Sequence, residues 1–131
     1  MTSLTRGIHH IGLTVQYLER SAHFFTQVLG WQEVKRNPDY PAIYVTDGDI
    51  LLTLWQVQTD APTSFDRKTQ VGLHHLALKV DSAEKLDEIF ELLITEQLKV
   101  EFPPKPVCQG PEKHMMCYEP SGIRIEIFWP G

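Results

Sequence analysis

The sequence predicts an α+β protein built from two βαβββ modules in tandem. Three observations predict this class. The order strand, helix, strand, strand, strand occurs twice along the 131 residues. The strand-like stretch GIHHIGLTV at 7–15 returns as GLHHLALKV at 72–80, with five of nine positions identical. The strands alternate between two faces of unlike polarity. We therefore expect a single domain over 1–131, with module one at about 7–57, a linker at about 58–70 and module two at about 71–131.

Module one begins with a strand at 8–15, which is rich in β-branched and apolar residues. Apolar residues at helical spacing follow from Leu18 to Leu29, and Gly30 stands where a helix often ends. Turn sequences at 37–39 and 47–49 then separate three further expected strands, at 31–36, 42–46 and 50–57.

Module two repeats this order. We expect its first strand at 72–80 and a helix whose first turn is capped by Asp81, with Glu84 three residues later. A short strand at 98–102, a Pro/Gly loop at 103–113, a strand at 114–118, a turn at 119–122 and a last strand at 123–129 complete the module.

Strand alternation separates the two histidines of each pair. His9 and His74 fall on the apolar face and are expected to be structural, whereas His10 and His75 fall on the polar face. If the modules pack about an approximate two-fold axis, His10 faces His75. Convergent polar groups between aromatic walls are typical of a ligand cavity. The other candidate residues of this face are Thr14, Thr53, Trp55, Lys79, Arg124, Glu126 and Phe128.

Composition excludes several function classes. The net charge of −5 and the absence of a basic cluster argue against a nucleic-acid partner. No apolar run approaches the ~20 residues of a membrane-spanning helix. The first ten residues lack the apolar core of a signal peptide, and two cysteines are too few for a disulfide scaffold. We expect a cytoplasmic protein with free thiols.

Four stretches, HHIGLTV, LERSAHFFTQVLGW, GLHHLALKV and EPSGIRIEIF, resemble the vicinal oxygen chelate superfamily, which includes glyoxalases, bleomycin-resistance proteins and extradiol dioxygenases. The resemblance covers nearly the whole chain. It implies a cup-shaped, mostly antiparallel sheet with helices on its outer face, a homodimer, and one divalent metal ion (Fe, Mn, Ni, Co or Zn). By this resemblance the metal ligands are His10, His75 and Glu126.

Two positions depart from particular branches of the superfamily. Glyoxalase I and methylmalonyl-CoA epimerase have a fourth ligand where this chain has Thr53. Fosfomycin-modifying members usually carry threonine where this chain has Gly12. The remaining set of two histidines and one carboxylate resembles that of extradiol dioxygenases, and it leaves positions on an octahedral ion for two adjacent substrate oxygens.

Catalytic groups beyond the ligands are expected on the neighbouring strand, where His114 and Tyr118 share one face. Lys79 and Arg124 are candidates for holding an anionic substrate group. The leading hypothesis is a metal-dependent enzyme on a small oxygen-chelating substrate, either an extradiol-type dioxygenase or a glyoxalase-like lyase or isomerase. The alternative is a non-catalytic protein that binds a drug or other small molecule, as bleomycin-resistance proteins do. Metal analysis of the purified protein distinguishes the two.

Overall fold

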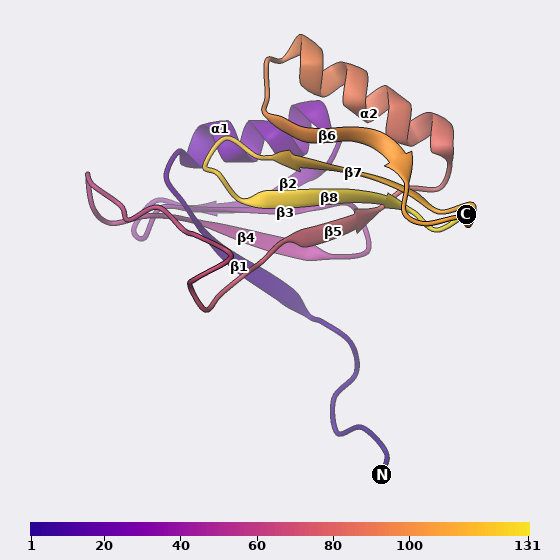
Figure 1. The fold of residues 1–131 in the computed structure, drawn as a ribbon. Helices are drawn as coiled ribbons and strands as arrows, with labels where there is room; N and C mark the ends of the chain where they lie inside the picture. The colour runs from indigo at the N-terminus through magenta and orange to yellow at the C-terminus, as the bar shows by residue number, and fades with distance from the viewer. The chain divides into compact units, whose positions relative to one another are not determined.

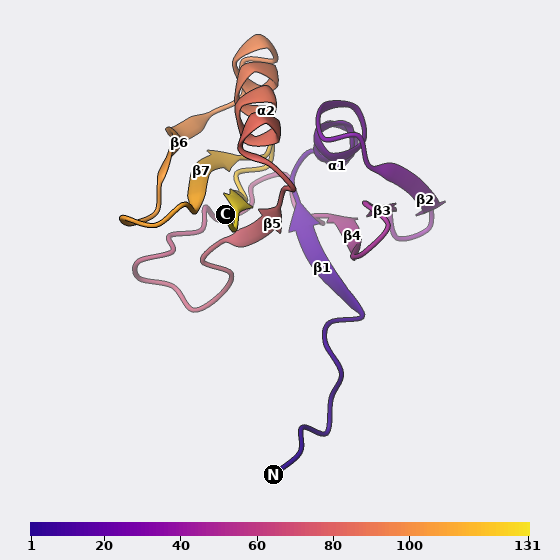
Figure 2. The ribbon, with the colours of Figure 1, turned by 90° about the vertical axis from the view of Figure 1, so that its right-hand side faces the viewer.

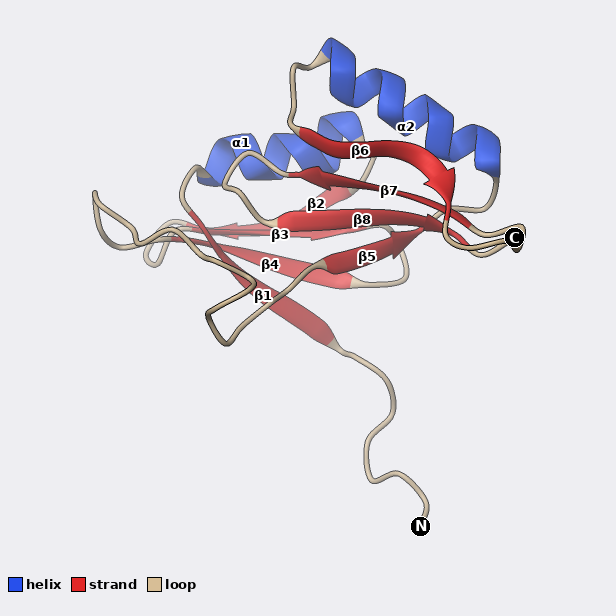
Figure 3. Cartoon of the chain, in the orientation of Figure 1, coloured by secondary structure: helices blue, strands red, loops and turns tan.

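The computed structural model describes residues 1–131, and its backbone contacts divide the chain into two units, Met1–Thr59 and Asp60–Gly131. Each unit contains one four-stranded sheet and one long helical segment in the order β-α-β-β-β. Figure 3 shows the two helical segments in blue and the strands in red. The predicted α+β class is confirmed, and each unit has the predicted order of elements.

In the first unit, hydrogen bonding gives the strand order β1-β4-β3-β2, with β1 and β4 parallel and the other pairs antiparallel (Figure 1). The helical segment contacts β3 and β4. The elements are β1 (His10–Val15), α1 (Leu18–His23), a π-helical turn η1 (Phe24–Val28), β2 (Gln32–Asn37), β3 (Ala42–Thr46) and β4 (Leu51–Gln56).

The second unit repeats the topology with the order β5-β8-β7-β6, and again only the first pair is parallel. Its helix contacts β6, β7 and β8, and Figure 2 shows it covering one face of this sheet. The elements are β5 (Leu76–Lys79), α2 (Ala83–Thr95), β6 (Val100–Pro106), β7 (Lys113–Tyr118) and β8 (Arg124–Trp129).

Alternation along the strands produces the two cores. Leu13 and Val15 of β1 are buried while Thr14 between them is exposed, and Ile125 and Ile127 of β8 are buried on either side of a less buried Glu126. The polar residues of β8 therefore lie on the face opposite its core residues. None of the helices has the length and apolar character that crossing a membrane requires.

The predicted strand at 72–80 is too long. Its partner β8 runs parallel to it and begins at Arg124, and the ladder starts with Leu76 opposite Ile125. Residues 72–75 therefore precede the strand. His9 and His74, expected on the core face, are both exposed, because each lies before the first residue of its strand, where no sheet covers it.

Three further boundaries differ from the prediction. Ser82, not Asp81, caps α2: its Oγ accepts a hydrogen bond from the backbone N–H of Lys85 at 3.2 Å. The helix expected after Tyr17 changes to π-helical geometry at Phe24, a change that apolar spacing does not signal. Strand β6 continues through three prolines to Pro106, because it is the edge strand and its register shifts twice.

Candidate functional site

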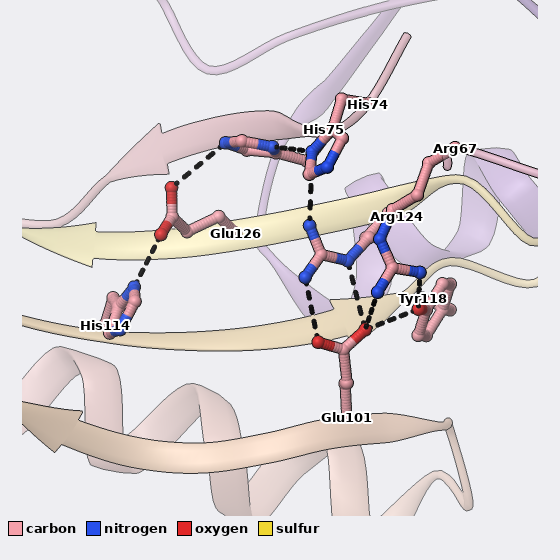
Figure 4. A network of polar contacts seen from close by, with 8 residues as sticks. All are labelled: Arg67, His74, His75, Glu101, His114, Tyr118, Arg124 and Glu126. Atoms are coloured by element: carbon pink, nitrogen blue, oxygen red, sulfur yellow. Dashed lines mark hydrogen bonds and ion pairs between the residues drawn. The ribbon is translucent and has the colours of Figure 1, made fainter. Parts of the chain in front are cut away.

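The polar face of the second sheet carries a continuous network of charged and hydrogen-bonding side chains (Figure 4). Its members come from the loop before β5 and from three strands. They are Arg67, His74, His75, Glu101, His114, Tyr118, Arg124 and Glu126.

Glu126 lies at one end of this network, between two histidines. Its Oε1 is 3.5 Å from Nε2 of His75, and its Oε2 is 2.5 Å from Nδ1 of His114. The Glu126 side chain is 13% exposed and that of His114 is 16% exposed, so neither carboxylate nor imidazole is freely hydrated. The aromatic rings of Phe102 and Phe128 contact His114, with centroids 4.9 and 6.2 Å away. The carboxylate is thus held from one side and directed at His75 on the other.

Glu101 of β6 forms the other end of the network. It accepts hydrogen bonds from Nε and Nη2 of Arg124 at 3.0 and 2.8 Å and from the hydroxyl of Tyr118 at 2.5 Å, and Arg67 lies 3.8 Å away. The hydrogen bonds from Arg124 lower the pKa of Glu101 to about 2. The same contacts raise the pKa of Arg124, and the hydrogen bond to Glu101 raises the pKa of Tyr118. Arg124, predicted to hold a substrate anion, is therefore already paired with a carboxylate.

His74 and His75 connect the two ends. Their Nδ1 atoms are 2.7 Å apart, and Nη1 of Arg124 lies 3.4 Å from Nδ1 of His74. Desolvation and the nearby Arg124 charge lower the pKa of His74. His75 consequently has one ring nitrogen facing His74 and the other facing Glu126.

A buried carboxylate fixes the start of β8. Glu119 is 1% exposed, and its Oε1 accepts hydrogen bonds from the backbone N–H groups of Ser121 and Ile123 at 2.8 and 3.0 Å. Gly122 closes this turn with φ of 93°, a conformation that favours glycine. The turn sets where the β8 ladder begins. It thereby places Arg124 opposite Tyr118 of β7, and Glu126 opposite both Ala77 of β5 and Met116 of β7.

In the first unit, His10 lies at the start of β1 and is exposed, with its Nδ1 2.9 Å from Nδ1 of His9. The position that corresponds to Glu126 holds Thr53, which is 3% exposed and accepts a hydrogen bond from Nε1 of Trp55 at 2.9 Å. A Cβ atom on Gly12 would lie 3.2 Å from Oγ1 of Thr53, so the absent side chain leaves room for this pair. Thr14 and Lys79 are exposed.

The predicted metal ligands are thus distributed over both units, His10 in the first and His75 and Glu126 in the second. Two donor atoms bound to one ion at about 2.1 Å lie about 3 to 3.4 Å apart, and the 3.5 Å between His75 Nε2 and Glu126 Oε1 is close to this spacing. The donor types, imidazole and carboxylate, suit a first-row divalent ion. No set of three or more His, Cys, Asp or Glu residues is gathered around a common point that would hold a metal ion. The ligand set therefore stays a prediction. For two of its members, His75 and Glu126, the distance between the side chains is compatible with binding one ion.

Sequence reasoning missed Arg67, His74, Glu101 and Phe102 as parts of this network. Arg67 lies in the stretch interpreted as a linker, and His74 was assigned to the core. Glu101 is a single acidic residue in a short strand, and nothing in its neighbours signals a partner 23 positions away. The histidine and tyrosine of β7 do lie on the network face, because His114 and Tyr118 pair across the ladder with Phe128 and Arg124.

Comparison with known proteins identifies the family. The family model of the Glyoxalase/Bleomycin resistance protein/Dioxygenase superfamily matches residues 7–127, and the chain belongs to this superfamily. Among curated proteins, it is 27% identical to the uncharacterized protein YqjT of Bacillus subtilis over 95% of this chain and 99% of that protein. It is 26% identical to the catechol-2,3-dioxygenase of the same organism over 98% of this chain, but spans only 44% of that enzyme.

Solved structures share the fold. A glyoxylase/bleomycin resistance protein/dioxygenase domain from Frankia sp. EAN1pec superposes with a TM-score of 0.83 at 25% identity, covering 95% of this chain and 98% of that one. A variant of the fosfomycin resistance protein FosX from Listeria monocytogenes, complexed with Mn(II) and a dihydroxypropylphosphonic acid, gives a TM-score of 0.77 at 16% identity, covering 98% and 95% of the two chains.

Proposed function

We propose that the protein is a divalent-metal-dependent enzyme that binds a small substrate through two adjacent oxygen atoms, with His10, His75 and Glu126 as the metal ligands. One observation carries the proposal: Nε2 of His75 and Oε1 of Glu126 face each other at 3.5 Å on the polar face of the sheet. His10 occupies the corresponding position of the repeated sequence stretch in the other unit. The metal complex of the FosX variant supports a metal-binding role for this fold.

The residues around Glu126 hold its carboxylate in one orientation. His114 donates a hydrogen bond from Nδ1 to Oε2 of Glu126, which leaves Oε1 directed toward His75. A hydrogen-bonded partner of this kind orients a ligating carboxylate. With its proton on Nδ1, a neutral His114 has its lone pair on Nε2, where it can accept a proton from a substrate hydroxyl. Phe102 and Phe128 keep the ring in place.

Ring cleavage of a catechol-like substrate is the reaction class that the ligand set favours. Two histidines and one carboxylate form the ligand set of non-haem iron oxygenases, and an ion held by His10, His75 and Glu126 would have open positions for two adjacent substrate oxygens and would supply Lewis-acid chemistry there. The similarity to a catechol-2,3-dioxygenase supports this class. The buried Thr53, hydrogen-bonded to Trp55, occupies the position where a four-ligand glyoxalase site has its additional carboxylate or amide.

We also propose that the protein is a cytoplasmic homodimer. Sedimentation equilibrium tests whether it is a dimer.

Metal content and activity test the proposal together. The purified protein is loaded with Fe(II), Mn(II) or Zn(II), dialysed, and analysed by elemental mass spectrometry, and the loaded forms are then assayed with catechols and with hemithioacetals. We expect about one ion per chain in the wild type and a loss of metal in His75→Ala, Glu126→Ala and His10→Ala.

The control variant is His23→Ala, because His23 is an exposed histidine of α1 and lies outside the network. It should bind metal like the wild type. A wild type that retains no metal would overturn the proposal in favour of a non-catalytic binding protein. Turnover of hemithioacetals without turnover of catechols would overturn the assignment to ring cleavage.

A further inference from the structure

We propose that Arg124 determines which nitrogen of His75 carries the proton, so that the lone pair of His75 lies on Nε2 and faces Glu126. Arg124 is thereby a positioning residue that acts through His74. The inference deepens the proposed function, and its relevance to metal binding rests on that function. It follows from four consecutive contacts in the second unit, which Figure 4 shows as a line from Glu101 through Arg124, His74 and His75 to Glu126.

The first step fixes Arg124 as a donor. Two of its nitrogens, Nε and Nη2, are bound to the carboxylate of Glu101. The side chain of Arg124 is 12% exposed and that of Glu101 28% exposed, so the pair is partly shielded from water. The third nitrogen, Nη1, is the one that lies 3.4 Å from His74. A guanidinium group has only N–H donors and does not lose its proton in proteins.

The contact with Arg124 decides which of the two neighbouring Nδ1 atoms, that of His74 or that of His75, carries a proton. Because Arg124 can only donate, Nδ1 of His74 must accept and therefore carries no proton. The Nδ1 atoms of His74 and His75 are 2.7 Å apart, and such a contact requires a proton on one of them. That proton is on His75.

The third step places the lone pair. A neutral imidazole carries one N–H, and the hydrogen bond made by one nitrogen decides the state of the other. With Nδ1 of His75 protonated, its Nε2 is an acceptor, and it faces the acceptor Oε1 of Glu126 at 3.5 Å. Two acceptors that face each other repel unless a cation lies between them. We call the four contacts from Glu101 to Glu126 the relay. It leaves the lone pair of His75 on Nε2, which is the form of the ring that would bind a metal ion.

The first unit provides an internal comparison. His9 and His10 make the same Nδ1–Nδ1 contact at 2.9 Å, but the β4 residue that corresponds to Arg124 is Leu51. A leucine side chain cannot donate a hydrogen bond. The proposal therefore applies to His75 and not to His10.

Nitrogen-15 NMR of the histidine rings tests the relay in the metal-free full chain at about pH 8, where long-range proton–nitrogen correlations show which nitrogen is protonated. For the wild type we expect His75 protonated at Nδ1 and unprotonated at Nε2. Arg124→Met should shift His75 toward the Nε2-protonated form, while the signals of His10 stay unchanged. Arg124→Lys retains a charged donor and should keep more of the wild-type state than Arg124→Met.

Two controls protect the test. Arg36→Met removes an arginine that also binds carboxylates, Glu19 and Glu33, but lies in the first unit, and it should leave His75 unchanged. If Arg124→Met does not fold, because Glu101 is left without its main partner, the double variant Glu101→Gln/Arg124→Met removes that unpaired charge and takes its place.

The proposal is overturned if wild-type His75 carries its proton on Nε2, or if His75 is unaffected in Arg124→Met. Titration with Mn(II) keeps the two proposals apart. We expect Arg124→Met to weaken Mn(II) binding about 10-fold. A protein with the expected tautomer that binds no Mn(II) would contradict the proposed function and leave the relay intact, whereas Mn(II) binding with the wrong tautomer would contradict the relay alone.

Discussion

Replacing Glu101 by glutamine removes the carboxylate that lies between two arginines, and the structure sets the size of the effect. The hydrogen bonds from Arg124 lower the pKa of Glu101 from its ordinary value of 4.5 to about 2. Since one unit of pKa difference is worth about 1.4 kcal/mol, this lowering corresponds to at most about 3.5 kcal/mol. The Glu101 side chain is 28% exposed, and solvent weakens the interaction. We therefore expect Glu101→Gln to lower the free energy of unfolding by about 1–2 kcal/mol near neutral pH.

The pH dependence of this difference has a definite sign. The carboxyl of Glu101 titrates near 4.5 in the unfolded chain and near 2 in the folded protein. Its stabilisation is therefore fully present above the unfolded value and is lost as the pH falls toward the folded one. Because glutamine does not titrate, the difference in stability between wild type and variant stays constant above about pH 5 and narrows below about pH 4.5.

Urea unfolding followed by tryptophan fluorescence at several pH values measures this difference. The matched control is Glu33→Gln. Glu33 also binds an arginine, Arg36, at 2.8 Å, but both side chains are well exposed, so we expect a change within about 0.5 kcal/mol. The reasoning is refuted if Glu101→Gln costs no more than Glu33→Gln, or if the difference widens as the solution becomes more acidic.

Three other substitutions have defined outcomes. Thr53→Val removes the acceptor of the Trp55 indole N–H and should cost about 1 kcal/mol in urea unfolding; an unchanged stability would contradict the importance of that hydrogen bond. Met115→Ala, at a fully buried position of β7, should lower the free energy of unfolding by about 2–4 kcal/mol, and a loss below 1 kcal/mol would place Met115 outside a tightly packed core. His114→Phe keeps an aromatic ring but no longer holds Glu126, so isothermal titration should show Mn(II) affinity reduced by about 10-fold or more; wild-type affinity would mean that Glu126 needs no such support.

Strand alternation and the internal repeat predicted most of the fold. Strand β3 has the expected bounds at Ala42–Thr46, and the buried residues of β1 and β8 follow the predicted two-residue period. Gly30 has φ of 78°, as expected for a glycine after a helix. These features depend on local chemistry, which the sequence contains. The start of β5 does not depend on local chemistry alone. It depends on the first residue of its partner β8, which is set by the turn around Glu119.

For the candidate site, the sequence predicted on which face of the sheet the residues lie, but not which residues contact one another. Period-two alternation placed Glu126, His114 and Arg124 on one face, and the structure has them there. The partners of these residues were not predictable, since Glu101 reaches Arg124 only through two antiparallel strand pairings. Arg124 illustrates the difference: from the sequence it is a candidate for holding a substrate anion, whereas in the folded chain it contacts the carboxylate of Glu101 and the ring of His74.

Pulsed electron paramagnetic resonance of the Mn(II)-loaded protein tests the central claim most directly, because it counts the imidazole nitrogens bound to the ion. If His10 and His75 are both ligands, the wild type shows two imidazole nitrogens. In His75→Ala and His10→Ala, which lose the ion on dialysis, the spectrum is recorded with Mn(II) in excess, and the ion that is still bound shows one. Bound Mn(II) without imidazole coupling, or a His75→Ala spectrum identical to that of the wild type, would contradict the claim.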